Sequence, residues 1–190
     1  MTSNLGCTDD TSMVLSISPQ PDADFSFTPN PALVLEDVFF TDESVGTGIN
    51  SWLWDYGDGE GDNQQNPIHS WSDGGDYDVM LVITDAAGCQ DTAVKVISIA
   101  LPPVLPTGFT PNGDGDNDVF IIRGGPFQST NFKVYNNWGQ LIFETNDALI
   151  GWDGTFKGQD APFGVYTWTF VVELANGKII RESGDVTLMR

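Results

Sequence analysis

The sequence has few basic residues: seven Lys and Arg stand against 27 Asp and Glu, which gives a net charge of −20 at pH 7. The imbalance is greatest in residues 1–100, which hold 17 of the acids and a single base, Lys95. A chain this negative repels phosphate backbones and anionic lipid surfaces. We therefore expect neither nucleic-acid binding nor membrane insertion.

Cysteine, histidine and long apolar runs are also scarce. The two cysteines form no Cys/His cluster for zinc, and no apolar stretch approaches the roughly 18 residues that span a bilayer. His69 is the single histidine, and the sequence holds no nucleophile elbow, zinc-protease helix or phosphate-binding loop. We predict that the protein is not an enzyme and requires no cofactor.

Alternating apolar residues and frequent turn signals dominate what is present. Residues 77–84 and 166–174 place apolar side chains on one face of a strand, and 132–135 and 140–144 flank a hairpin turn. Asn176–Gly177 is a two-residue hairpin turn, and 21 Gly and 11 Pro suit many short connections. The chain length favours two domains. The sequence predicts an all-β fold of two Ig-like antiparallel β-sandwiches in tandem.

A short internal repeat suggests where the domains begin and end. The segment GCTD at 6–9 returns as GCQD at 88–91, and Val14–Ile17 aligns with Val96–Ile99 at the same offset of 82 residues. Chance similarity over so short a match is the alternative. We expect four segments: a remnant strand of a preceding repeat at 1–18, one complete module at 19–100, a stiff Pro-rich linker at 101–106 and a second domain at 107–190.

The same repeat bears on the two cysteines. Cys7 and Cys89 fall on equivalent positions of successive repeats. Such positions lie about one module length apart, much farther than the 4.4–6.8 Å between Cα atoms that a disulfide needs. We predict two thiols.

Linked motifs in the first module identify a family. They are WDYGDG at 54–59, NPIH at 66–69 and GDY at 75–77, followed by alternating apolar residues. In this order they resemble the PKD family of Ig-like extracellular domains. Trp71 stands where the family usually has Tyr, so an aromatic side chain is kept. The resemblance implies a seven-stranded sandwich that serves as a spacer or adhesive unit.

The second domain carries a different set of motifs over nearly its whole length. It resembles the gliding-motility-associated C-terminal domain, the type B sorting domain of the type IX secretion system. Asn137 replaces the Arg that the family usually has, so a role for that cation is not carried over. The motifs are FTPNGDGDND at 109–118, VYNNWG at 134–139, GWDG at 151–154, PFGVY at 162–166 and GDVTLMR at 184–190.

This resemblance implies export through the periplasm and across the outer membrane of a gliding, Bacteroidetes-like bacterium, ending extracellularly at the cell surface in association with the outer membrane. The implied partners are the type IX translocon and a PorP/SprF-like outer-membrane protein. A PKD-type array that ends in this domain is similar to the C-terminal end of SprB-like gliding adhesins. The terminal motif supplies the sorting residues: Gly184, Asp185, Val186, Thr187, Leu188, Met189 and Arg190.

One Gly-rich loop has the spacing of a calcium site. Asn112, Asp114, Asp116 and Asp118 place oxygen ligands at every second position, which a tight loop can turn toward one centre. The EF-hand pattern is incomplete, because Arg123 stands where a bidentate Glu is needed. The alternative is that these side chains hydrogen-bond their own turns. A second acidic set, between Asp55 and Asp62, is explained better by turn chemistry.

The tryptophans leave a second function open. Trp54, Trp152 and Trp168 lie in motifs where an Ig-like core needs large apolar side chains. Trp52 and Trp71 are less constrained and could contact a surface polysaccharide. A carbohydrate-binding adhesive module is therefore the alternative to a secretion signal with a spacer.

Overall fold

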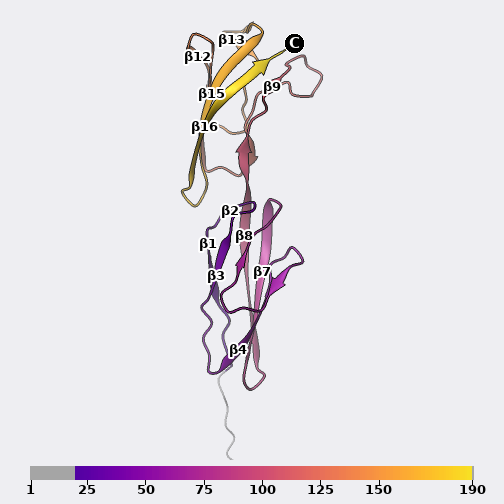
Figure 1. Ribbon diagram of the computed structural model, residues 1–190, viewed down its shortest axis with the longest axis vertical. Helices are drawn as coiled ribbons and strands as arrows, with labels where there is room; N and C mark the ends of the chain where they lie inside the picture. The colour runs from indigo at the N-terminus through magenta and orange to yellow at the C-terminus, as the bar shows by residue number, and fades with distance from the viewer. Residues whose placement is uncertain (1–19, 190) are drawn as a thin grey trace, which may run out of the picture.

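The computed structural model describes residues 20–189, and this range consists of strands and loops without a helix. The all-β prediction is confirmed (Figure 1). No helix that could cross a membrane occurs in residues 20–189. The strands are β1 (Phe25–Thr28), β2 (Ala32–Leu33), β3 (Val38–Asp42), β4 (Ile49–Asp55), β5 (Gly61–Asp62), β6 (Ile68–His69), β7 (Gly75–Asp85), β8 (Gln90–Val104), β9 (Gly108–Phe109), β10 (Arg123–Gly125), β11 (Ser129–Tyr135), β12 (Leu141–Thr145), β13 (Thr155–Phe156), β14 (Gln159–Asp160), β15 (Gly164–Glu173) and β16 (Ile179–Leu188).

The first module packs two sheets against each other. One sheet has the order β1-β3-β6, and the other has the order β10-β8-β7-β4-β5, with β2 parallel to β8. Strand β7 alternates as predicted, because side chains at every second position point into the core. The buried side chains from both sheets include Phe25, Val38, Phe40, Trp54, Tyr56, Trp71, Val79, Leu81, Ile83, Ile97 and Ile99.

An aromatic cluster closes one side of this core. The His69 ring stacks on Tyr56 with 4.0 Å between ring centroids, and it meets Trp71 edge-on at 4.6 Å. His69 Nε2 lies 2.8 Å from the Asp58 carboxylate. Trp71 is 1 % exposed, so the expectation that it could contact a polysaccharide is wrong: the core needs its volume. Trp52 is half-buried and donates from Nε1 to Asp42 at 2.7 Å.

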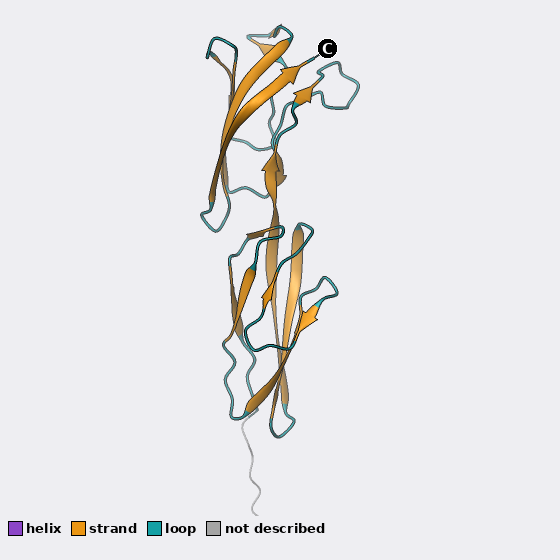
Figure 2. Cartoon of the chain, in the orientation of Figure 1, coloured by secondary structure: helices purple, strands orange, loops and turns teal. Residues whose placement is uncertain are grey.

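The second domain is built on one five-stranded sheet with the order β12-β11-β15-β16-β9. Both predicted hairpins, β11–β12 and β15–β16, are present. The two-residue turn predicted at Asn176–Gly177 is wrong, because the Leu174 amide donates to the Lys178 carbonyl and leaves the three residues 175–177 in the loop, with Gly177 at a φ of 80°. Long segments with little strand cover the inner face of the sheet (Figure 2). Phe120 and Trp152 in these segments exchange two backbone hydrogen bonds of 2.8 and 2.9 Å. The buried core includes Phe109, Phe120, Ile122, Phe132, Val134, Trp152, Tyr166, Phe170, Val172, Val186 and Leu188.

The two domains meet through a strand and a turn. Strand β8 runs through the first module and continues to Val104, where its last residues pair with β10 of the second domain. On another side, Asn176 Nδ2 donates to the Pro31 carbonyl at 2.6 Å, and Lys178 Nζ lies 2.6 Å from Glu36 Oε1. The predicted linker at 101–106 therefore begins inside a paired strand, which restricts bending at this point.

Residues 1–18, and Cys7 with them, lie outside the described residues. The remnant-strand prediction and the absence of a Cys7–Cys89 disulfide stay predictions. Cys89 is exposed in the turn between β7 and β8.

Candidate recognition site

Most of the terminal motif of the second domain lies within β16, which has a neighbouring strand on each side. Strand β16 pairs with β15 along its whole length, from Ile179↔Glu173 to Leu188↔Gly164. On its other side, the end of β16 pairs in parallel with β9. The backbone amides of Thr187 and Met189 donate to Thr107 and Phe109 carbonyls at 3.0 and 3.1 Å. The end of β16 is thus held by two neighbouring strands.

The predicted sorting residues divide between the two faces of this strand. Val186 and Leu188 are each 1 % exposed and belong to the core. Asp185 and Met189 are exposed, Thr187 is half-buried, and Arg190 lies outside the described residues. A factor that reads this motif can therefore contact only part of it directly.

Gly184 has a packing role. A Cβ atom there would lie 2.7 Å from Cζ2 of Trp168, so glycine allows the indole to lie across β16. Trp168 in turn stacks on Phe170 with 5.6 Å between ring centroids. Any side chain at 184 would have to displace this stacked pair.

The loop 112–118 is held by hydrogen bonds of its own. Asp118 accepts from the backbone amides of Gly113 at 2.6 Å and Gly115 at 2.8 Å. Asp114 accepts from the Asp116 amide and from Asn112 Nδ2, both at 2.8 Å. The hydrogen bonds from Asp116 and Asn112 lower the pKa of Asp114.

These contacts match the turn alternative to a calcium site. In residues 20–189 no three His, Cys, Asp or Glu side chains are grouped so that they could hold a metal ion. The carboxylates of Asp114 and Asp118 already accept backbone hydrogen bonds, and Ca²⁺ would have to share them. Calcium binding stays a prediction.

An exposed tryptophan marks the turn between β11 and β12. Trp138 is 91 % exposed. Asn136 Oδ1 accepts from the backbone amides of Trp138 and Gln140, each at 3.0 Å, and Gly139 has a φ of 72°. The turn therefore depends on Asn136 and Gly139, and the indole takes no part in it. The sequence motif contained Trp138, but nothing in its pattern separated it from the buried tryptophans.

A second exposed aromatic side chain precedes β15. Phe163 is 69 % exposed, and the preceding Pro162 carbonyl accepts from the Tyr166 hydroxyl at 2.6 Å. Register places Phe163 near the chain end, because Gly164 pairs with Leu188. Tyr135, the last residue of β11, pairs with Thr167, so the turn with Trp138 lies at the same end of the sheet.

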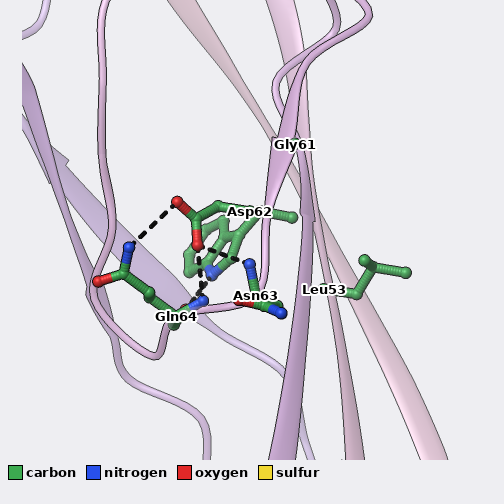
Figure 3. Close-up of a pocket in the computed structure, with 6 residues that line it drawn as sticks. Leu53, Gly61, Asp62, Asn63 and Gln64 are labelled. Atoms are coloured by element: carbon green, nitrogen blue, oxygen red, sulfur yellow. Dashed lines mark hydrogen bonds between the residues drawn. The ribbon is translucent and has the colours of Figure 1, made fainter.

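The first module offers a shallow hollow beside β5. It has a volume of about 510 Å³ and is lined by residues of β4 and of the segment 61–64 (Figure 3). Asp62 Oδ1 accepts from the amides of Asn63 and Gln64 at 2.6 and 2.7 Å. Trp54, the aromatic residue in the lining, is 1 % exposed. The hollow therefore lacks the exposed ring on which a sugar would stack.

Comparisons with known proteins divide the chain in two. A family model for the PKD domain matches residues 18–99. A family model described as the CHU_C Type IX secretion signal domain matches residues 104–188. Both are non-catalytic types of module.

Proteins of known sequence or structure are similar to parts of this chain. The pre-pro-metalloprotease PrtV of Vibrio cholerae is 38 % identical over 58 residues, which are 30 % of this chain and 6 % of that protein. Collagenase ColA of Clostridium perfringens is 30 % identical over 97 residues, 50 % of this chain and 9 % of that protein. The PKD1 domain of Vibrio anguillarum Epp is 26 % identical with a TM-score of 0.41, covering 45 % of this chain and all of that structure. The chain thus spans only a small part of the two proteases.

Proposed function

This chain is a PKD domain followed by a type IX secretion signal domain, and we propose that it is the C-terminal export and surface-attachment region of a large cell-surface adhesin. The secretion signal implies interaction with the type IX machinery and a surface or extracellular location. In the proposal the adhesin belongs to a gliding bacterium and stays associated with the outer membrane. The PKD domain acts as its spacer or adhesive unit.

One observation carries the proposal: the terminal motif is part of the folded sheet. Val186 and Leu188 are buried in the core, and β16 has neighbours on both sides at its end. A short linear address would be accessible along its whole length, whereas here the strand supplies backbone pairing and core packing. The signal is therefore a folded surface, and we infer that the translocon and a PorP/SprF-like outer-membrane protein recognise that surface.

The spacer role follows from the junction between the domains. Pairing of β8 with β10 and the contacts of Asn176 and Lys178 hold the two domains at separate points. An extended arrangement in which each domain keeps its own core suits a shaft that carries a passenger away from the export site (Figure 1).

Catalysis plays no part in this proposal. The imidazole of His69 stacks on Tyr56 and contacts the Asp58 carboxylate, contacts that serve the core of the PKD domain. Although parts of this chain are similar to segments of two proteases, the matched segments are only 6 % of PrtV and 9 % of ColA. We propose that the chain is a non-enzymatic module that requires no cofactor.

A passenger experiment tests the proposed function. A periplasmic fluorescent protein is fused to the N-terminal side of residues 1–190 in a host with type IX secretion and the matching PorP/SprF-like protein. We expect fluorescence at the cell surface or in the medium, and retention in the periplasm when the fusion ends at residue 103. Export by the shorter fusion, or retention of the full one, would contradict the proposal.

A further inference from the structure

Three segments meet at the end of the second domain that lies farthest from the PKD domain. They are the turn 136–139, the segment 162–165 and the end of β16, and we call them together the free end (Figure 1). The register of β11, β15 and β16 places them side by side. The β15–β16 turn, with Asn176 and Lys178, lies at the opposite end and contacts the PKD domain.

The free end exposes more aromatic surface than its fold requires. Trp138 is 91 % exposed, Phe163 is 69 % exposed and Met189 is 48 % exposed. The turn at Trp138 is held by Asn136 and Gly139, and these contacts do not involve the indole. Tryptophan side chains dominate the binding energy of many protein interfaces once they are buried by a partner. These side chains gather at one end of the sheet, because the register of β11, β15 and β16 brings their segments together, and neighbouring exposed apolar side chains mark interaction sites.

The opposite end cannot serve the same purpose. Its turn donates a hydrogen bond to Pro31 and forms an ion pair with Glu36 of the PKD domain. A passenger fused before the PKD domain is also attached at that end, because β8 connects the PKD domain to the second domain there. The PKD domain and any passenger attached to it lie at the opposite end. They therefore do not block a partner that binds the free end.

The negative charge around the free end indicates which kind of partner can bind it. Two loop segments, 111–118 and 153–160, meet beside Leu188 at the end of β16, where Gly154 lies against Pro111 and Leu188. They carry Asp114, Asp116, Asp118, Asp153 and Asp160, and Lys157 is the one cation within these two segments. A second copy of the chain would bring the same acids into contact, and an anionic lipid surface would repel them. A protein surface with an apolar pocket bordered by Lys and Arg complements both features.

We propose that the free end, through Trp138 and Phe163, is the surface by which a protein component of the export machinery holds this domain. This inference rests on the proposed function and assigns its recognition to specific side chains. The exposed indole enters an apolar pocket of the partner, and the surrounding carboxylates pair with basic residues at the pocket rim. Buried residues of β16 support this surface without touching the partner.

The test uses the passenger fused to residues 1–190, unchanged or as W138A/F163A. Loss of two interface aromatics weakens binding by about tenfold or more, so we expect surface fluorescence to fall by at least about tenfold. Leu149→Ala is the matched control, because Leu149 is 86 % exposed in the loop after β12, away from the free end. We expect the control to be exported like the unchanged fusion. Equal thermal melting of the three purified full chains shows that folding is unaffected.

The outcomes separate the two claims. Failure of the unchanged fusion to leave the cell contradicts the proposed function. Export of the unchanged fusion together with undiminished export of W138A/F163A leaves the proposed function standing and overturns the docking surface. Cosedimentation of the full chain with phosphatidylcholine vesicles that is lost in W138A would assign the free end to a bilayer, and this too overturns the inference.

Discussion

The two ends of the second domain use the same β-hairpin geometry for different purposes. At the end next to the PKD domain, the β15–β16 turn uses its side chains for contacts within the chain, through Asn176 and Lys178. At the free end, the β11–β12 turn is stabilised by Asn136 and leaves Trp138 91 % exposed. The difference indicates that one end joins modules and the other is available for binding.

Strand β16 connects these two ends. Substitutions on its buried face should have the largest effect on the stability of the second domain. Leu188 is 1 % exposed, so we expect Leu188→Ala to lower the free energy of unfolding of the second domain by about 2–5 kcal/mol. Met189→Ala, next in sequence and 48 % exposed, should change it by less than about 0.5 kcal/mol. Urea unfolding of the full chain, followed by Trp fluorescence, measures both. Equal losses in the two variants would mean that the strand is not packed as described.

A substitution at Gly184 tests the packing of β16 against Trp168, between the two ends of the domain. Gly184→Ala brings a Cβ atom to within 2.7 Å of Trp168, so we expect a loss of about 1–3 kcal/mol in the free energy of unfolding. Gly177→Ala is a less suitable control, because that residue has a φ of 80°. Ser183→Ala, on an exposed neighbouring position of β16, should be nearly neutral in the same unfolding experiment.

Calcium binding would add stability through the loop 112–118, which lies beside the free end. If the loop 112–118 binds Ca²⁺ with the affinity of extracellular modules, 1 mM Ca²⁺ should stabilise the full chain by about 0.4–1.4 kcal/mol through linkage. Thermal melting in calcium and in chelator measures the difference, and D114A/D116A should abolish it. Superimposable melting curves for the unchanged chain would leave hydrogen bonding within the turn as the account of this loop.

Substitutions at the contact between the two domains should have the smallest effect on stability. We expect Lys178→Ala to cost about 0.2–1 kcal/mol, because both partners of the ion pair are partly exposed. The variant should broaden the distribution of distances between spin labels placed on the two domains. The charge swap K178E/E36K should restore the narrow distribution, and a swap that behaves like the single variant would rule out the ion pair as its cause.

The same ion pair predicts a dependence on pH. Burial works to raise the pKa of Glu36, but the hydrogen bonds from Lys178 and from the Leu33 amide outweigh it and leave the pKa lowered. A carboxyl group whose folded pKa is lowered contributes stability above its unfolded pKa and loses it as the pH falls through the folded value. The distance distribution should therefore be unchanged at neutral pH and broaden only below about pH 4.

The two hairpins of the second domain and the buried faces of β7 and β15 could be predicted from the sequence, because alternation over about ten residues leaves one face for the core. The β15–β16 hairpin followed from Asn176–Gly177 and the apolar positions before it. The cover over the second sheet could not be predicted, since Phe120 and Trp152 pair across irregular segments that have no period. Trp71 and Trp138 show the same limit: burial of one and exposure of the other depend on contacts that are distant in sequence.

Crosslinking during export tests the docking surface most directly. A photoreactive amino acid replaces Trp138 in one fusion and Leu149 in another, and each passenger is enlarged so that export stalls. We predict that position 138 crosslinks to an outer-membrane protein of the type IX machinery and that position 149 does not. Crosslinks from position 149 alone, or equal crosslinks from both positions, would contradict recognition at the free end.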